Sequence, residues 1–416
     1  MKEETGELLE HLFRQISGRL TGHVTRLLGP ARLDLAEEIV QESMLRALET
    51  WPYQGTPENP AGWLFRTARN RAMDLLRHES MAERKHAQEG PAAVTVEPPD
   101  FEDDAQIRDD ELRMIFMCCH PEIARDARVA LSLKIAGGFS VREIARAFLT
   151  EEATIAQRLV RAKRQIREKG LGLEMPRGAD LAGRMEAALE VLYFVFNEGY
   201  AAHEGEDLVR RDLCVEALRL GLALAESEVA RPELHALVAM MALQAARLPA
   251  RVDALGDLVL LEDQDSSKWD RELIGLGFHH FDLSIAGDEV SEYHLQAAIA
   301  AAHVRGAGGA ADWEMILEQY DRLWEMSGWS PVVALNRAVA VGKVRGAEEA
   351  LAALDGLERD APMRQYHLFL AARGHFLREL GRREEAARCY RAALECRCSE
   401  PERRLLRRKL GECEVS

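Results

Sequence analysis

The stretch that decides the fold is FSVREIARAFLTEEATIAQRLVRAKRQIREK, residues 139–169. Ser140 is a favourable helix N-cap, and Glu143 three residues later completes a capping box. The segment LTEE, residues 149–152, interrupts the first helix, and Thr150 is the expected N-cap of a second one. A short helix, a tight turn and a second amphipathic helix predict a helix-turn-helix unit.

The second helix of this unit has an apolar side and a basic side. Its expected buried residues recur at helical spacing: Ile155, Leu159, Ala162 and Ile166. The opposite side carries Gln157, Arg158, Arg161 and Arg164. In a helix-turn-helix such a side enters the major groove of DNA, where arginine contacts phosphates or guanine. The alternative is a solvated basic helix, but caps, turn and apolar face agree with one another and favour the DNA-binding interpretation.

The composition predicts an all-α chain with two or three domains. At 416 residues it is too long for one ordinary core. Helix-forming residues dominate, aromatic residues make up only 6%, and strand-type runs are scarce. The net charge of −16 is uneven, because most of the excess acid lies after residue 170 and another acidic run lies at 97–111. Without that run the N-terminal part is mildly basic.

The sequence also indicates a compartment. The N-terminal segment is acidic and amphipathic and lacks the apolar core of a secretory signal. The most apolar stretches, at 185–196 and 234–243, are too short to span a bilayer. The seven cysteines are scattered, which is typical of reduced thiols. We therefore expect a cytoplasmic protein with no membrane partner.

Breaks in the helical pattern divide the chain. Residues 86–104 are rich in proline, glycine and acid, which is a linker composition, and residues 170–180 form a second break. The predicted divisions are a helical bundle at 1–87, an acidic linker at 88–106, the helix-turn-helix region at 107–170, a helical extension at 180–325 and helical repeats at 326–416.

The C-terminal end has a repeat-like pattern of small residues and one tyrosine. These residues fall at the spacings of a tetratricopeptide repeat: Gly374, Gly381, Ala386, Tyr390 and Ala393. Small residues let two antiparallel helices approach, and the tyrosine fills the gap between them. The alternative is a generic stack of helical hairpins, which has nearly the same shape.

Two blocks of sequence carry a family resemblance. The first is the helix-turn-helix stretch with LSLKIAGG before it; the second consists of DLAEEIVQESMLRALE at 34–49 and PENPAGWLFRTARNRAMDLLRHE at 57–79. They resemble, respectively, region 4 and region 2 of the group IV, or extracytoplasmic-function, RNA polymerase sigma factors. The resemblance covers about residues 5–170. It implies a region 2 helical bundle, a region 4 helix-turn-helix and a role in promoter recognition and transcription initiation.

By this resemblance, the helix at 34–49 binds the polymerase core. Ile39 and Leu45 are expected to face the core of the bundle, while Glu38, Gln41 and Glu42 form an exposed acidic face. In the family this face docks on the basic clamp helices of the β′ subunit, and complementary charge steers such an association. The family also implies a contact with the flap of the β subunit.

The resemblance assigns the helix at 63–77 and the loop at 54–60 to the minus-ten element of the promoter. That side of the helix suits a DNA backbone and a base flipped out of the stack. The candidate residues are Trp63, Arg66, Arg69, Asn70 and Arg77. Trp63 has two interpretations: it stacks on a base, or it anchors the core, which is the more frequent role of such a tryptophan.

The resemblance assigns the basic helix to the minus-thirty-five element. The candidate residues are Thr154, Gln157, Arg158, Arg161, Lys163 and Arg164. Ala156 stands where the family commonly has an arginine, and alanine cannot donate a hydrogen bond to a base. We therefore expect readout to depend on Gln157, Arg158 and Arg161, and the promoter sequence to be unusual.

The part after residue 170 resembles the extension of a subgroup of these factors that carries a tetratricopeptide-like C-terminal domain. The segments at 117–134, 196–220 and 258–274 share that resemblance. In the subgroup the extension is thought to regulate the sigma factor in cis. The acidic charge fits an intramolecular partner, so the expected partners are polymerase core, promoter DNA, and either the chain's own C-terminal domain or an unknown protein bound by the repeats.

Catalytic and metal sites find little support in the sequence. None of the candidates has the spacing of a zinc hydrolase, a zinc finger or a calcium loop: His203 with Glu204, His279 with His280, Cys118 and Cys119 with His120, and Asp263 to Ser267. We expect no cofactor, no metal and no enzyme activity. The competing hypotheses are a helix-turn-helix regulator that acts without polymerase, and a helical-repeat scaffold for a protein partner.

Overall fold

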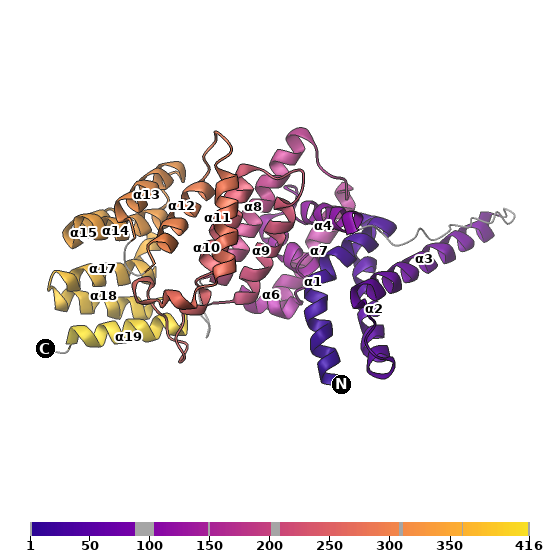
Figure 1. Cartoon of the computed structure of the whole chain (residues 1–416), viewed down its shortest axis with the longest axis horizontal. Coiled ribbons are helices and arrows are strands. Elements are labelled where there is room, and N and C mark those ends of the chain that lie inside the picture. The colour runs from indigo at the N-terminus through magenta and orange to yellow at the C-terminus, as the bar shows by residue number, and fades with distance from the viewer. Residues whose placement is uncertain are drawn as a thin grey trace. The chain divides into compact units, whose positions relative to one another are not determined.

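The computed structural model describes residues 2–87, 104–148, 150–200, 209–307, 311–359 and 361–414. Within these ranges the chain is helical, and its extended pairing is limited to one isolated bridge between Val252 and Leu258. The prediction of an all-α fold is confirmed. The chain divides into two compact units, Met1–Phe194 and Val195–Ser416, which Figure 1 shows in colours from indigo to yellow.

Three helices form the first bundle of the N-terminal unit: α1 (Lys2–Leu28), α2 (Leu33–Gln54) and α3 (Pro60–Ala87). A 3₁₀ turn, η1 (Pro30–Arg32), joins the first two. Their apolar faces meet in one core, in which Leu20, Ile39 and Leu64 are fully buried. α2 ends at Gly55, whose φ of 86° suits a residue without a Cβ.

Four shorter helices form the second bundle: α4 (Asp104–Cys118), α5 (Arg125–Ile135), α6 (Val141–Ala147) and α7 (Glu152–Lys169). The capping box of Ser140 and Glu143 at the start of α6 is confirmed. The predicted cap of α7 is wrong: its N-cap is Glu151, one residue beyond Thr150, and no side chain caps the helix. The buried positions Ile155, Leu159, Ala162 and Ile166 are confirmed.

Two glycines of α1 allow the two bundles to approach each other closely. A Cβ on Gly22 would lie 2.7 Å from the carbonyl oxygen of Asp110 in α4, and one on Gly18 would lie 2.5 Å from that of Ala136 after α5. The neighbouring residues on α1 include the small, buried Ser17 and Thr21. The first helix of the chain is thus part of both bundles.

Helix α8 (Gly178–Tyr200) follows the predicted break at 170–180 and packs against the second bundle. Phe194 stacks on Phe148 at the end of α6, with ring centroids 5.7 Å apart. Glu190 bonds two arginines of α5, 2.9 Å from Arg125 and 3.1 Å from Arg128. The boundary between the two units falls inside this helix, after Phe194.

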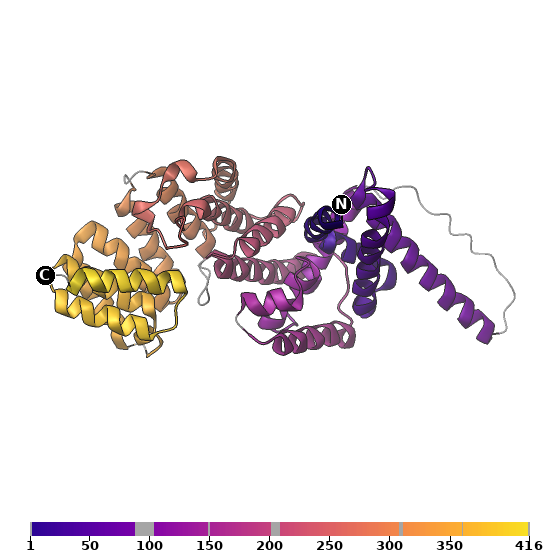
Figure 2. The ribbon, with the colours of Figure 1, turned by 90° about the horizontal axis from the view of Figure 1, so that it is seen from below.

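The C-terminal unit is a succession of helices, visible in Figure 2 as paired rods. They are α9 (Arg211–Ala225), α10 (Pro232–Ala245), α11 (Arg271–Ser284), α12 (Glu292–Arg305), α13 (Trp313–Met326), α14 (Pro331–Arg345), α15 (Ala347–Asp355), α16 (Ala361–Arg364), α17 (His367–Glu379), α18 (Arg383–Glu395) and α19 (Glu400–Glu414). Short 3₁₀ turns include η2 (Leu248–Ala250), η3 (Leu261–Asp263), η4 (Ser266–Lys268) and η5 (Gly356–Arg359). α10 is apolar all round, since it is buried among its neighbours.

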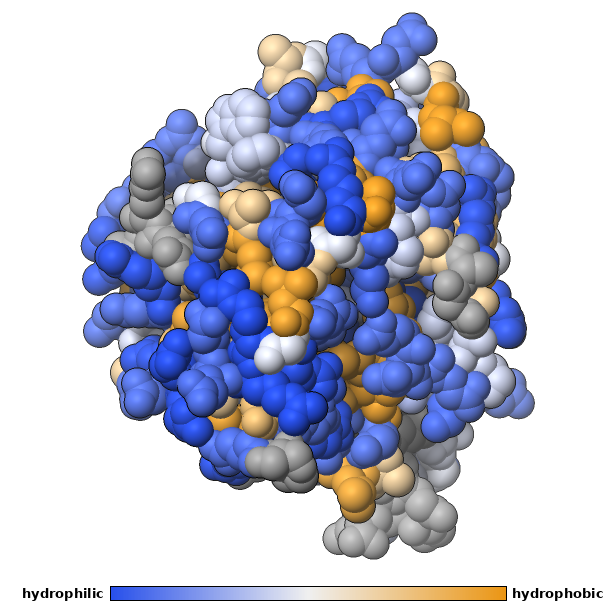
Figure 3. Space-filling view, turned by 90° about the vertical axis from the view of Figure 1, so that its left-hand side faces the viewer, coloured by the Kyte–Doolittle hydropathy of each residue, from blue (hydrophilic) through white to orange (hydrophobic). Residues whose placement is uncertain are grey.

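The last helices form the hairpins expected from the glycine and tyrosine spacing. The buried ring of Tyr390 in α18 lies where a Cβ on Gly374 of α17 would meet it at 3.0 Å. Figures 1 and 2 both show α17, α18 and α19 side by side. Figure 3 views the molecule from the left-hand side of Figure 1, and this face is mostly hydrophilic with separate apolar areas. Their assignment as tetratricopeptide repeats stays a prediction.

Substituting Gly22 by alanine tests the close approach of α1 and α4. The added methyl group meets the backbone of Asp110, so we expect the free energy of unfolding to fall by about 1–3 kcal/mol. The matched control is Gly183→Ala in α8, where nothing lies within 4 Å of the new Cβ. That change should raise stability by about 0.5–1 kcal/mol. Urea unfolding followed by circular dichroism measures both, and equal stabilisation by the two variants would contradict the packing.

Candidate nucleic-acid interface

The basic helix α7 presents its predicted polar side to solvent. Gln157, Arg161 and Arg164 are exposed, while Thr154 and Arg158 are partly buried. Arg164 pairs loosely with Glu168 one turn later, at 3.6 Å. Such an exposed pair contributes little stability, so the guanidinium remains available to another anion.

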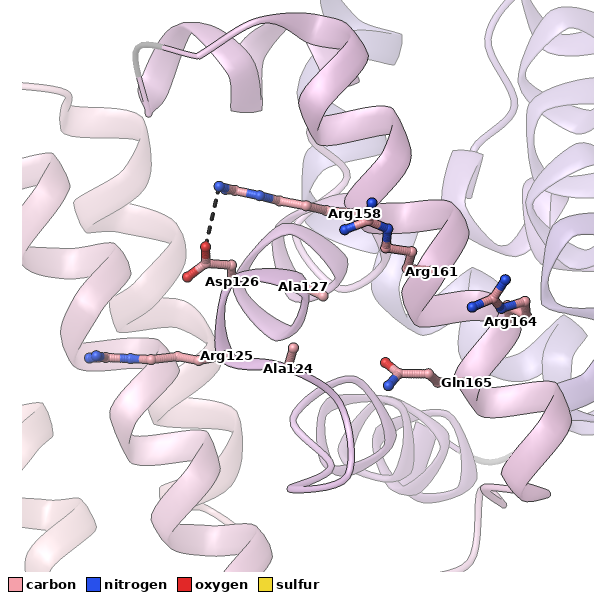
Figure 4. Close-up of a pocket in the computed structure, with 8 residues that line it drawn as sticks. All are labelled: Ala124, Arg125, Asp126, Ala127, Arg158, Arg161, Arg164 and Gln165. Carbon is pink, nitrogen blue, oxygen red and sulfur yellow. Dashed lines mark ion pairs between the residues drawn. The ribbon is translucent and has the colours of Figure 1, made fainter.

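A groove of about 420 Å³ runs between α7 and the start of α5. Figure 4 shows three arginines that line it from α7, namely Arg158, Arg161 and Arg164. Arg158 bonds Asp126 at 3.2 Å, whereas Arg161 has no ion-pair partner among the residues described. The N-terminus of α5 opens on the same groove, and helix N-termini favour anions. The groove therefore suits a phosphate backbone.

Lys163 lies on a different side of α7 from these arginines. It bonds Asp34 at 2.7 Å and also Glu37, both in the first turns of α2. Burial opposes its charge, but the two carboxylates outweigh that effect and raise the pKa of Lys163. In this structure Lys163 forms a contact between the two bundles, and its contact with DNA stays a prediction.

The exposed face of α2 combines acids with leucines. Glu38 and Gln41 are exposed, and Glu42 bonds Arg71 of α3 at 2.8 Å. The prediction that Leu45 faces the core is wrong, because 58% of it is exposed, and Leu48 is 43% exposed. Both leucines lie at helical spacing from Glu38 and Gln41, so they share the acidic face. The exposed face of α2 is therefore partly apolar as well as acidic.

The candidate minus-ten residues lie along α3. Arg66, Asn70 and Arg77 are exposed on one side of the helix, and Arg77 has a weak contact with Asp74 at 3.5 Å. Arg69 flanks them and is partly buried. Trp63 is partly buried and packs edge to face on the ring of Trp51, at 5.5 Å.

Comparison with known proteins bears on this arrangement. The family described as Sigma-70 region 2 matches residues 12–81, and Sigma-70, region 4 matches residues 113–166. The ECF RNA polymerase sigma factor SigK of Mycobacterium ulcerans is 30% identical over 150 residues, which are 36% of this chain and 78% of that protein. The chain belongs to the extracytoplasmic-function RNA polymerase sigma factors.

This sigma factor carries a C-terminal extension beyond regions 2 and 4. Residues 184–285 match a family of unknown function, DUF6596. Uncharacterized protein R00370 of Rhizobium meliloti is 41% identical over 383 residues, which are 91% of this chain and 90% of that one. No solved structure matches the chain.

Two buried carboxylates connect the region 2 and region 4 bundles of the sigma factor. Asp110 and Glu111 of α4 are 2% and 1% exposed. Asp110 accepts a bond of 2.9 Å from Arg26, and Arg19 donates one of 2.8 Å to Glu111. Burial raises the pKa of Asp110, but hydrogen bonds from His23 and Arg26 outweigh it, so the pKa lies below its usual value.

Sequence reasoning missed these acids because they end the acidic run at 97–111. The apolar residues that follow at once, Leu112, Met114 and Ile115, are buried. They are the signal that a helix packed in a core begins before residue 107. The expected linker at 88–106 overlaps the first residues of α4, which begins at Asp104; residues 88–103 lie outside the described part of the chain.

The remaining candidates are the residues considered above as metal ligands. His203 and Glu204 lie outside the described residues. Cys118 and Cys119 are buried free thiols, as predicted. Among the residues described, no three His, Cys, Asp or Glu side chains are placed to hold one metal ion. Nor is any described helix long and apolar enough to cross a membrane.

Acid should weaken the contact between α1 and α4. Because the pKa of Asp110 is lowered by folding, its ionised form stabilises the protein above about pH 4, the pKa range of an unfolded aspartate. That contribution is lost as the pH falls through the lower, folded value. Asp110→Asn should cost about 1–3 kcal/mol at pH 7 and leave a weaker acid dependence.

The matched control is Asp109→Asn, which removes the neighbouring, partly exposed carboxylate that pairs with Arg113 within α4. It should cost at most about 0.5 kcal/mol. Urea unfolding at pH 7 and at pH 3.5 measures the free energy of unfolding of each variant. Hydrogen exchange of the backbone amides of α1 and α4 shows whether the loss is located at this contact. The same loss in both would show that the buried carboxylate has no special role.

Proposed function

We propose that this sigma factor binds RNA polymerase core and directs it to promoters in the cytoplasm, as a specificity subunit without enzyme activity of its own. The observation that carries the proposal is the pairing of two unlike surfaces in one unit. α2 offers acids and exposed leucines, Glu38, Gln41 and Leu45, whereas α7 offers a row of arginines beside a groove.

The α2 surface is the proposed site for the β′ clamp helices. A DNA-binding regulator that acts without polymerase has no use for an exposed face of acids and leucines. Acids give fast, oriented association with a basic partner, and buried leucines give slow dissociation. Region 4 is proposed to bind the β flap. The proposed functional divisions are 1–87, 107–170, 180–325 and 326–416, although α4 begins slightly earlier, at Asp104.

The α3 and α7 surfaces are the proposed promoter contacts. Arg66, Asn70 and Arg77 suit the minus-ten strand, with Arg69 beside them. Trp63 packs on Trp51, which supports the core role over base stacking. Along the groove of α7, Arg158, Arg161 and Arg164 suit phosphates of the minus-thirty-five element, and Gln157 suits a base edge.

A variant of the α2 face tests binding to polymerase. We expect Glu38→Lys combined with Leu45→Asp to weaken binding to the purified core enzyme at least tenfold. The first change reverses a charge, and the second places a charge where the exposed Leu45 would be buried against the partner. The control is Glu186→Lys, an exposed acid of α8. It should change the affinity less than twofold. Biolayer interferometry with the full chain measures both.

Failure of the wild-type chain to bind core would contradict the sigma function. In that case, salt-dependent binding of the free chain to duplex DNA would support the regulator that acts without polymerase. Binding of neither would favour the helical-repeat scaffold.

We also propose that the extension regulates region 4 in cis, and that α8 is where it does so. Glu190 of α8 holds Arg125, which lines the α7 groove, and Arg128 next to it. Both arginines are thereby partly neutralised beside the surface proposed for DNA. Phe194 on Phe148 fixes α8 in place. A partner bound by the repeats would change this restraint.

The variant Glu190→Gln should release the two arginines. Each released arginine can then contact a DNA phosphate, so the slope of log affinity against log salt concentration should steepen by about 1–2. The exposed neighbour Glu186→Gln is the control and should leave the slope unchanged. The measurement uses holoenzyme and promoter fragments selected from genomic DNA. An unchanged slope for Glu190→Gln would remove α8 from the mechanism.

Two truncations locate the restraint. A chain that ends at Gly170 lacks Glu190, whereas a chain that ends at Tyr200 keeps the whole of α8. If α8 carries the restraint, only the shorter chain should gain promoter affinity. If both gain, the restraint lies in the C-terminal unit. If deleting residues 171–416 changes neither affinity nor transcription, regulation in cis is wrong.

A further inference from the structure

The C-terminal unit contains a buried arginine that forms no ion pair with any acid the structure describes. Arg247 lies between α10 and η2 and is 7% exposed. Its Nε donates one long hydrogen bond, 3.4 Å to the side-chain oxygen of Gln264. Its guanidinium carbon lies 5.8 Å from the centre of the Trp269 ring. Among the described residues no acid forms an ion pair with it.

A second arginine lies on the other side of η2. The guanidinium carbon of Arg251 is 3.8 Å from the ring centre of Tyr200, and its Nε is buried without an acceptor among the described residues. The charges of the two arginines are close enough for Arg251 to lower the pKa of Arg247, after the larger effect of burial. A buried cation next to a second, partly buried one is unfavourable unless an anion joins them.

Among the described residues, the groups known to lie near the two arginines are polar or aromatic, and none of them is a carboxylate. Tyr200 and Tyr320 lie near Arg247, and His303 of α12 is next to it. Burial, and then the charge of Arg247, lowers the pKa of His303 to about 4, so this histidine is neutral at pH 7. Tyr200 at the end of α8, Gln264 and Trp269 of the η3–η4 segment and His303 of α12 therefore lie near the two guanidinium groups.

These features describe a receptor for an oxyanion. A guanidinium offers planar donors that match phosphate or carboxylate, and a doubly charged anion neutralises two of them. An arginine kept only for structure would be expected to have a carboxylate partner, as Arg210 has in Glu198 at 2.9 Å. Both arginines fall in the stretch 184–285, whose family has no known function.

We propose that Arg247 and Arg251 form a binding site for a small, doubly charged oxyanion, with a phosphate group as the preferred chemistry. The source is either free phosphate or the phosphate of a metabolite. The site lies in the extension, so its ligand is a signal for this part of the chain. The inference does not depend on the polymerase or promoter assignments.

Thermal unfolding of the full chain tests the site. Inorganic phosphate at millimolar concentration should raise the Tm of the wild type by several degrees relative to potassium chloride of the same ionic strength, because a ligand of the folded state stabilises it. Sodium sulfate, which has the same charge and shape, should act similarly. Isothermal titration calorimetry with phosphate gives the affinity and the number of sites.

The decisive variant is Arg247→Met. Because it removes a buried, uncompensated charge and keeps an apolar chain of similar length, its Tm without phosphate should equal or exceed that of the wild type. Its response to phosphate should be lost. A structural arginine would give the opposite result, a lower Tm with the response retained. Arg345→Gln, at an exposed position of α14, is the control and should respond as the wild type does.

Arg251→Gln provides a second measurement, at a less buried position, if the first variant does not fold. It should weaken phosphate binding at least tenfold. The proposal is overturned if the wild type shows no phosphate response at concentrations up to about 20 mM, at which a site with a millimolar Kd would be mostly occupied. It is also overturned if a folded variant at either arginine responds as strongly as the wild type.

Discussion

The pairing of two buried carboxylates of α4 with the basic side chains of α1 is the constraint on which the N-terminal unit depends. Asp110 and Glu111 are buried, and each is held by an arginine from the first helix. Removing one partner of such a pair leaves an uncompensated charge in the interior. The free energy lost in this way is larger than the net stabilisation that the pair provides. Gly18 and Gly22 permit the approach that the pairing requires. Region 2 and region 4 are thereby held as one body.

Much of the fold could be predicted from the sequence, because its signals are local. The capping box of Ser140 and the apolar face of α7 depend on residues three or four positions apart, which any reader of the sequence can compare. The burial of Asp110 depends on a partner 84 positions away, which no local pattern reveals. The exposure of Leu45 was not predicted for a similar reason: helical spacing alone does not tell which apolar residues the neighbouring helices cover.

The candidate site was predicted in its outline but not in its pairing. The arginines of α7 lie on the side of the helix that the pattern predicted. Lys163, in contrast, points to the acids of α2. The contact of Glu190 could not be predicted, because nothing in the sequence links an acid of the extension to the arginines of α5. In both places the missing information is the charge that comes from another helix. Unpaired Arg247 is the converse case, a charge whose partner the described chain does not provide.

One consequence concerns how such a protein can be assembled from parts. The boundary between the two units falls inside α8, an uninterrupted helix of 23 residues, about 34 Å long. A recombination junction placed before this helix would remove Glu190 and Phe194, which contact Arg125 and Phe148 of region 4. A chimaeric sigma factor therefore keeps these contacts only if residues 178–194 stay with region 4.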